Sequence, residues 1–202
     1  MKELYITRHG QTDYNKEHIV QGRGINSSLN EFGRKQARQF FEDHKAEKFD
    51  AIYVSSLDRT HQSMANFEKE QQYELLKRPQ IDEISWGIHE GMKPSAETHG
   101  FYKELMESWA SGKVHVGIEG GETPYQVADR LKEFMAELKE TSHEKVLICT
   151  HGRTMRIFIC LLLGEPLSNM QKFGHSNLIL YKVNWNGVNG EVEYVQELVF
   201  KD

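Results

Sequence analysis

The chain has 202 residues, of which 38% are hydrophobic and 27% charged, and its formal net charge at pH 7 is −5. This apolar content can offset the conformational entropy lost on folding, which disfavours a disordered chain, and the length favours one domain over residues 1–202. Nucleic acids and anionic membrane surfaces attract positive charge. We therefore expect neither as a partner of this acidic chain.

The two cysteines, Cys149 and Cys160, lie in apolar runs and predict buried thiols, with no disulfide framework. The N-terminus reaches Arg8 before an apolar region of signal length can develop. The longest apolar stretch, residues 157–163, is far shorter than the roughly 20 residues that cross a bilayer. We expect a cytoplasmic protein that is a monomer or a homodimer.

Short apolar runs alternate with helical patterns along the chain. The runs that predict buried strands span residues 2–7, 49–54 and 145–150. The patterns that predict helices span residues 29–41, 57–73, 124–138 and 154–163. Two β-like runs follow at 177–183 and 191–200, separated by Asn186-Gly187 and Asn189-Gly190, which are hairpin turn signals. The alternation predicts a three-layer α/β/α sandwich, with a mostly parallel central sheet and an antiparallel edge strand or hairpin.

Residues 85–122 differ from the rest in their glycines, histidines and weak periodicity. We interpret this segment as a cap-like insertion and not as a separate domain. A helix over about 95–110 is predicted inside it, because Phe101, Leu105 and Trp109 recur at helical spacing. We expect these three side chains to pack as core.

Two matching junctions carry the functional prediction: Arg8-His9-Gly10 and Thr150-His151-Gly152 each follow a predicted strand. The carboxyl ends of parallel strands line the crevice in which ligands bind, so the two histidines are expected to face one cavity. The second junction leads directly into a predicted helix, and a helix N-terminus favours an anion. Arg59 also follows a strand exit, and guanidinium groups bind phosphate oxygens well. Together these features predict a phosphate pocket.

At these residues the sequence resembles the histidine phosphatase superfamily, in the branch that includes cofactor-dependent phosphoglycerate mutase. The matches run through most of the chain. They comprise residues 8–15, Leu29, Gly33, Gln36-Ala37, residues 55–60, Glu83, Gly87, Glu90-Gly91, residues 120–123 and residues 150–152.

The resemblance implies that His9 attacks phosphorus and forms a phosphohistidine. It implies that Arg8, Arg59, Gly152 and a protonated His151 hold the phosphate oxygens, with Asn15 as a further phosphate-binding donor. Glu83 would then protonate the leaving alkoxide and later activate water, which requires a raised pKa in the first half.

The choice of the acid is open between Glu83, which the resemblance favours, and its neighbours Asp82 and Glu90. Glu122, close to the predicted start of a helix, is given no catalytic role.

The function predicted from these residues is a phosphatase that hydrolyses a small phosphorylated metabolite, without a cofactor or metal. A phosphoglycerate mutase is the first alternative, although Arg153 stands where mutases have asparagine. A metal-dependent hydrolase is disfavoured because neither HExxH nor CxxC occurs. A noncatalytic phosphate-binding module is a further alternative. Arg23 and Arg153 are candidates for binding a second anionic group of the substrate, whereas Asn26 and Ser28, where the family often has Asp and Pro, are expected to change only loop packing.

Overall fold

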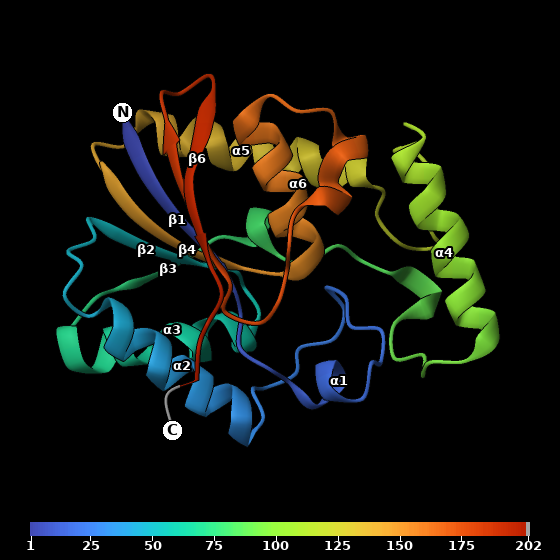
Figure 1. The fold of residues 1–202 in the computed structure, drawn as a ribbon, viewed down its shortest axis with the longest axis horizontal. Helices are drawn as coiled ribbons and strands as arrows, with labels where there is room; N and C mark the ends of the chain where they lie inside the picture. Colours follow the sequence, from blue (N-terminus) through green and yellow to red (C-terminus); the bar gives the residue numbers. More distant parts are fainter. Residues whose placement is uncertain (201–202) are drawn as a thin grey trace.

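A computed structural model describes residues 1–200, which form a six-stranded mixed sheet covered on both faces by helices (Figure 1). The strand order is β3-β2-β4-β1-β5-β6. The strands are β1 (Lys2–Arg8), β2 (Ala51–Val54), β3 (Leu75–Lys77), β4 (Lys145–Thr150), β5 (Leu180–Trp185) and β6 (Gly190–Gln196). The first four are parallel, whereas β5 is antiparallel to β1 and β6 to β5. The predicted parallel sheet with an antiparallel edge hairpin is confirmed.

Side chains of the central strands alternate between two apolar layers. Leu4 and Ile6 of β1 pack in the cluster that includes α5 (Pro124–Glu140) and α6 (Gly152–Leu163). Tyr5, between them, packs in the opposite cluster with α2 (Glu31–His44) and α3 (Asp58–Gln71). Because successive strand residues point to opposite faces, one strand supplies both layers. Figure 1 shows the two helix pairs on the two sides of the sheet.

The described residues also form two further α-helices and three 3₁₀ helices. They are α1 (Asp13–Lys16), α4 (Ala96–Ala110) and the 3₁₀ helices Pro79–Ile81, Gly87–His89 and Leu167–Lys172. Figure 1 places α4 at one side of the molecule, away from the sheet. Ser95 caps α4 as a capping box with Thr98, which explains why the helix begins at Ala96.

The predicted helix at 95–110 is confirmed, but one of its expected core residues is not. Leu105 and Trp109 are buried, whereas Phe101 is 37% exposed and packs edge-on against His89 at the surface. None of the helices within residues 1–200 is long and apolar enough to span a membrane.

Three details differ from the sequence prediction. The strand β3 and the single-turn helix α1 were not predicted, because each is too short to show a periodicity. The strand β5 begins at Leu180 and not at Asn177, because residues 177–179 form a turn with Leu178 in the left-handed region at φ 57°. The Leu178 N–H there donates to the Arg8 carbonyl, and the Asn177 side chain donates to the His9 carbonyl at 2.8 Å. This turn is therefore fastened to the end of β1.

Candidate active site

The two His-Gly junctions lie side by side because their strands are neighbours. In the register of β1 and β4, Arg8 pairs with Thr150, and the His9 N–H donates to the Thr150 carbonyl at 3.0 Å. The imidazole centroids of His9 and His151 are 5.1 Å apart, and both rings are buried. The structure thus brings together the two histidines that the sequence predicts to share one site.

The orientation of the His9 ring is fixed by its own loop. Nδ1 lies 2.7 Å from the Gly10 carbonyl oxygen, which can only accept, so Nδ1 carries the proton. Burial, followed by the charges of Arg59 and Arg8, holds the pKa of His9 well below 6.5, although the Gly10 hydrogen bond opposes this shift. The ring is therefore neutral, and its Nε2 lone pair is free to act as a nucleophile.

His151, the N-cap residue of α6, is held between Arg59 and Ser55. The Arg59 Nε–H donates to Nδ1 at 3.1 Å, so Nε2 carries the ring proton and donates to Ser55 Oγ at 2.8 Å. Burial and then the charge of Arg59 lower the pKa of His151 well below its ordinary value. The protonated His151 that the resemblance implies concerns the ring beside a bound dianion and stays a prediction, whereas these contacts favour the neutral ring. Protonation at Nδ1 requires loss of the Arg59 hydrogen bond.

Arg8 and Arg59 flank the histidines. Arg59 is fully buried, and its terminal nitrogens donate to the carbonyls of Ile25 at 2.7 Å and Gly22 at 3.3 Å. Each terminal nitrogen carries a second hydrogen that these contacts do not use. Arg8 Nη1 donates to the His175 carbonyl at 2.6 Å, while its buried Nε has no partner. Burial lowers the pKa of both arginines to about 10, so both remain charged at neutral pH.

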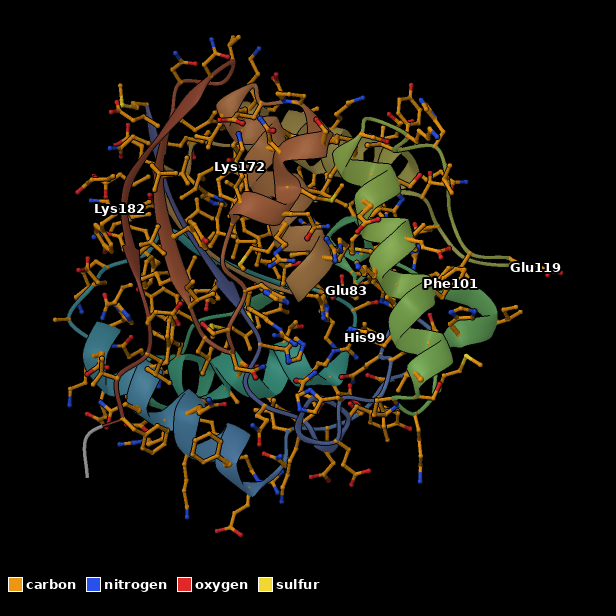
Figure 2. The ribbon with its side chains drawn as sticks, turned by 45° about the vertical axis from the view of Figure 1, so that its right-hand side comes forward. Glu83, His99, Phe101, Glu119, Lys172 and Lys182 are labelled. Carbon is orange, nitrogen blue, oxygen red and sulfur yellow. The ribbon has the colours of Figure 1, made fainter. Side chains whose placement is uncertain are left out.

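Glu83 lies at the N-terminus of α6, and Figure 2 shows it between α6 and α4. Its Oε1 accepts the N–H groups of Ile84 and Thr154, each at 3.0 Å. Within residues 1–200, its Oε2 accepts only the Arg153 N–H, at 3.2 Å. A carboxylate at a helix N-terminus satisfies otherwise free N–H groups and is favoured by the helix dipole. These bonds fix the carboxyl group and leave Oε2 the less engaged oxygen.

The other two candidate acids are engaged elsewhere. Asp82 accepts the backbone N–H and the hydroxyl of Ser56 at 2.7–2.8 Å and pairs with Arg23 at 3.5 Å. Glu90 accepts the Trp86 N–H at 3.0 Å. The contacts of Asp82 and Glu90 are those of carboxylates that hold loops together.

A buried ion pair that the sequence prediction did not include holds the segment carrying Glu83. Arg130 of α5 donates to the carbonyls of Gln80, Asp82 and Glu83 at 2.7–3.1 Å. It also binds both carboxylate oxygens of Glu122, and one of these accepts the Ser85 N–H at 2.9 Å. Glu122 is thus more than a charge near a helix start, because together with Arg130 it fixes residues 80–85.

Asn15 and Gly152, the remaining predicted phosphate-binding residues, lie at the same end of the sheet. Asn15 Oδ1 accepts the Thr12 N–H at 3.2 Å and an Asn177 amide hydrogen at 3.3 Å, so its side chain also orders the loop after β1. Gly152 is the first residue of α6. A Cβ there would lie 3.0 Å from the His175 ring and 3.4 Å from Arg8 Nε, so glycine permits a close approach.

The loop that carries His9 is in backbone contact with α2. A Cβ on Gly33 would lie 2.0 Å from the Gln11 carbonyl oxygen, and a Cβ on Gly10 would lie 2.8 Å from the Gly33 carbonyl oxygen. Neither glycine can be replaced without moving backbone. The first turn of α2 therefore determines where the loop after His9 runs.

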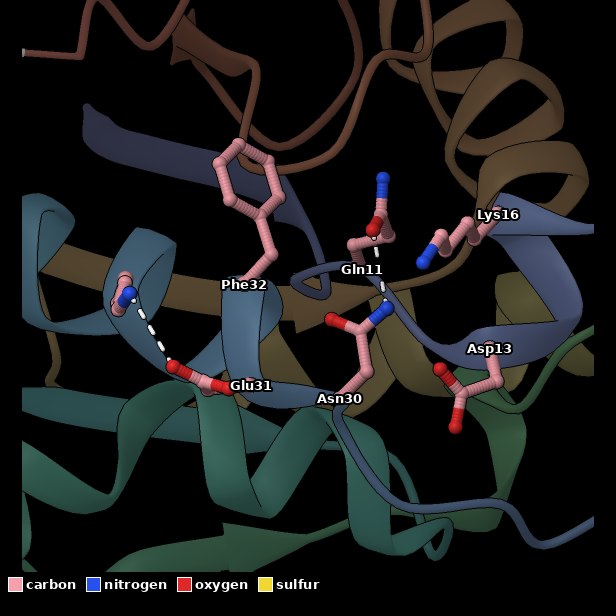
Figure 3. A pocket seen from close by; sticks show the side chains of 7 residues that line it. Gln11, Asp13, Lys16, Asn30, Glu31 and Phe32 are labelled. Carbon is pink, nitrogen blue, oxygen red and sulfur yellow. Dashed lines mark hydrogen bonds and ion pairs between the residues drawn. The ribbon is translucent and has the colours of Figure 1, made fainter.

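A surface pocket lies close to this loop, between α1 and the start of α2 (Figure 3). Its lining includes two acids and two lysines: Asp13, Glu31, Lys16 and Lys35. These opposite charges balance, so the pocket has no net preference for an anion. Among residues 1–200, no cluster of three or more potential ligands is arranged to hold a metal ion.

Comparison with known proteins places this arrangement in a family. The model of the histidine phosphatase superfamily (branch 1) matches residues 4–197. The chain belongs to this superfamily.

Two relatives are named as phosphoserine phosphatases, both from Hydrogenobacter thermophilus. Phosphoserine phosphatase 1 is 31% identical over 178 residues, which cover 88% of this chain and 83% of the relative. Putative phosphoserine phosphatase 2 is 28% identical over 200 residues, which cover 98% of this chain and 97% of the relative. The histidine phosphatase described here is, like them, a phosphomonoesterase that acts on small metabolites.

A mycobacterial glucosyl-3-phosphoglycerate phosphatase has a similar fold. It superposes with a TM-score of 0.85 at 23% identity, over 96% of this chain and 98% of that chain. The fold of the histidine phosphatase thus agrees with its family assignment.

Several residues that shape the site escaped the sequence prediction. Ser55 and Arg130 act through contacts with residues 96 and about 50 positions away. His175 and Asn177 come from the loop before β5, in which Asn177 was predicted as strand and His175 was assigned to no element. The sequence signals for Ser55 were its place at the exit of β2 and its position in the matching segment 55–60, and neither indicates its contact with His151.

Proposed function

We propose that this histidine phosphatase hydrolyses its substrate through a phosphohistidine on His9. The support is the neutral ring, whose Nδ1–H is fixed on the Gly10 carbonyl. In the first step Nε2 attacks phosphorus in line, the N–P bond forms, and the bond from phosphorus to the ester oxygen breaks. The leaving oxygen takes a proton from Glu83.

In the second step a water molecule attacks the phosphohistidine. Glu83, now a carboxylate, accepts a proton from this water, and the N–P bond breaks to release phosphate and restore neutral His9. We assign the proton transfer to Oε2, because Oε1 already accepts two backbone N–H groups.

Arg8 and Arg59 hold the phosphoryl oxygens in this proposal. Arg8 Nε is buried without a partner, and each terminal nitrogen of Arg59 has an unused hydrogen. Charge at these positions stabilises the transferring group, and Gly152 lets Arg8 approach the start of α6 closely. Asn15 and His151 complete the phosphate pocket in this proposal, with the His151 Nε2–H turning from Ser55 Oγ to a phosphoryl oxygen.

Residues 85–122 form the cap over the leaving-group side. Trp86 and Trp109 stack at 5.9 Å inside this segment, and Glu83 lies between α4 and the start of α6 (Figure 2). The substrate is thus a small phosphoester whose alcohol portion faces the cap.

The proposal is tested by trapping the phosphoenzyme from a radiolabelled phosphoester. Wild type should give a label that is stable to alkali and lost in acid, as a phosphoramidate is. His9→Ala should give no label and at least about a thousandfold lower kcat. His61→Ala is the matched control, because His61 lies on α3 beside Glu68 and outside the site.

Label or turnover retained by His9→Ala, with wild-type circular dichroism, would show that another group is the nucleophile. Isomerisation of a phosphorylated substrate without phosphate release would assign the chain to the mutases.

A further inference from the structure

The side chain of Arg153 lies on the leaving-group side of the candidate site. Arg153 is the second residue of α6, and its backbone N–H donates to the Glu83 carboxylate. Its guanidinium carbon lies 5.2 Å from the ring centre of Trp109 and 5.9 Å from that of Trp86. Stacking on aromatic faces holds a guanidinium in a defined plane. The charged group therefore sits between Glu83 and the cap helix α4.

This guanidinium has almost no hydrogen-bond partner in the described part of the chain. Nη2 contacts Met106 Sδ at 3.0 Å, and a thioether is a weak acceptor. Nε and Nη1 are buried and have no partner at all. An unpaired buried charge is costly to a folded protein, so this arrangement indicates binding capacity that is kept for another group.

A second guanidinium adds positive charge near Arg153. It belongs to Arg156, and Glu83 is the carboxylate that attracts both groups. The nearby His175 ring is neutral, because burial and then the charge of Arg156 lower its pKa to about 3. Burial and then the charge of Arg156 lower the pKa of Arg153 to about 10, which leaves it charged at neutral pH.

The other predicted anion-binding arginine is already paired. Arg23 contacts Asp82 at 3.5 Å and Glu122 at 3.6 Å. Arg156 is also engaged, because it donates to the Phe173 carbonyl and to Gln171 Oε1. Among these three arginines, Arg153 alone has buried N–H groups without a partner.

We propose that Arg153 binds a carboxylate on the leaving group, so that the preferred substrates are phosphoesters of hydroxy acids or hydroxy amino acids. One free guanidinium beside a stacked pair of indole rings suits a planar monoanion, whereas a second phosphate would need a further uncommitted cation. This inference rests on the proposed function, because it assumes that the alcohol portion of the ester faces Glu83.

The test compares two substrates that differ only in a carboxylate, O-phospho-L-serine and O-phosphoethanolamine. A second pair, 3-phosphoglycerate and glycerol 3-phosphate, replaces the carboxylate by a hydroxymethyl group. Wild type should favour the carboxylate in at least one pair by about tenfold or more in kcat/KM. Arg153→Met should reduce that ratio to about one, and Arg153→Lys should give an intermediate ratio, because lysine keeps the charge without the planar fork. Arg23→Met, the matched control, should keep the wild-type ratio.

The outcomes separate this inference from the proposed function. Equal kcat/KM within both pairs for wild type would overturn the inference whether or not the variants fold, and so would an unchanged ratio in a folded Arg153→Met. Phosphate release would still support the phosphatase mechanism in both cases. Failure of wild type to release phosphate from these esters and from p-nitrophenyl phosphate would overturn both.

Discussion

The ion pair of Glu122 and Arg130 offers a sharp test of how the site is held. Glu122→Gln keeps the shape of the side chain but removes the charge that faces Arg130 Nε at 2.9 Å and Nη2 at 3.1 Å. It also places an amide N–H group against a guanidinium that can only donate. Arg130 would keep its bonds to the carbonyls of Gln80, Asp82 and Glu83, but its charge would be uncompensated.

The expected loss in free energy of unfolding follows from the burial of the Glu122–Arg130 ion pair. Breaking a fully buried ion pair costs about 3–5 kcal/mol. The side chains of Arg130 and Glu122 are 12% and 18% exposed, so partial solvation reduces the expected loss in free energy of unfolding to about 2–3 kcal/mol. For a chain of this length, this corresponds to a fall in Tm of about 4–12 °C.

Urea unfolding at neutral pH measures the effect, with Glu137→Gln as the matched control. Glu137 lies on α5, as Arg130 does, and pairs with Arg78 at 2.7 Å, but the side chains of Glu137 and Arg78 are 34% and 30% exposed. The control should therefore lose less than about 1 kcal/mol. Equal losses in the two variants, or a loss below about 0.5 kcal/mol for Glu122→Gln, would refute the assigned role of the ion pair.

The effect should also depend on pH in a defined direction. Burial alone would raise the pKa of Glu122, but the hydrogen bonds and charge of Arg130, with the Ser85 N–H and Arg23, lower it below 4.5. A carboxyl with a depressed pKa stabilises the fold above its unfolded value, and this contribution is lost as pH falls through the folded value. The difference in free energy of unfolding between wild type and Glu122→Gln should therefore be largest above about pH 5 and should decrease in more acidic solution.

Three further outcomes are expected. The pKa of His9 lies well below 6.5, so the ring should stay neutral as the pH falls from 6.5 to about 5.5. The rate at which p-nitrophenyl phosphate phosphorylates His9, measured as a burst of p-nitrophenol, should therefore fall by less than half over this range. An inflection of this rate at pH 6.5 would contradict a neutral buried ring. In a single turnover, Glu83→Gln should slow the phosphorylation of His9 by an alkyl phosphate by at least about a hundredfold, and should slow the burst of p-nitrophenolate much less, because this leaving group needs no proton; equal losses in the two single-turnover rates would argue against an acid role. Trp109→Ala should lower the free energy of unfolding by about 3–5 kcal/mol in urea titrations, because Trp109 is 1% exposed and donates to the Val116 carbonyl. Phe101→Ala should lower it by less than about 1.5 kcal/mol, because Phe101 is 37% exposed. Similar losses for the two variants would contradict the difference in burial.

The sequence predicted the fold and the position of the two histidines correctly where a hydrophobic run ends in a recognisable motif. The strands that end at Arg8 and Thr150 have buried central runs, and the carboxyl ends of parallel strands lie at one edge of the sheet, so the meeting of His9 and His151 could be predicted. The hairpin of β5 and β6 was evident from its Asn-Gly dipeptides, and Gly187 adopts φ 92° there.

Contacts between distant segments could not be read in the same way. An arginine in the middle of a helix is most often solvated, and nothing near Arg130 in the sequence indicates that it reaches the carbonyls of residues 80–83. Phe101 fits the helical spacing of Leu105 and Trp109, but α4 turns that position toward the surface. The neutral state of His151 depends on the direction of one Arg59 hydrogen bond, which only the folded geometry determines.

The contact between Gly10 and Gly33 has a consequence for how this enzyme tolerates change. The nucleophile loop rests directly on the peptide backbone of a helix whose side chains take no part in the proposed chemistry. A single methyl group at position 33 would push against the Gln11 carbonyl and transmit its displacement to the imidazole two residues earlier. The region in which substitutions impair catalysis therefore extends into the first turn of α2, well outside the set of groups that touch the phosphoester.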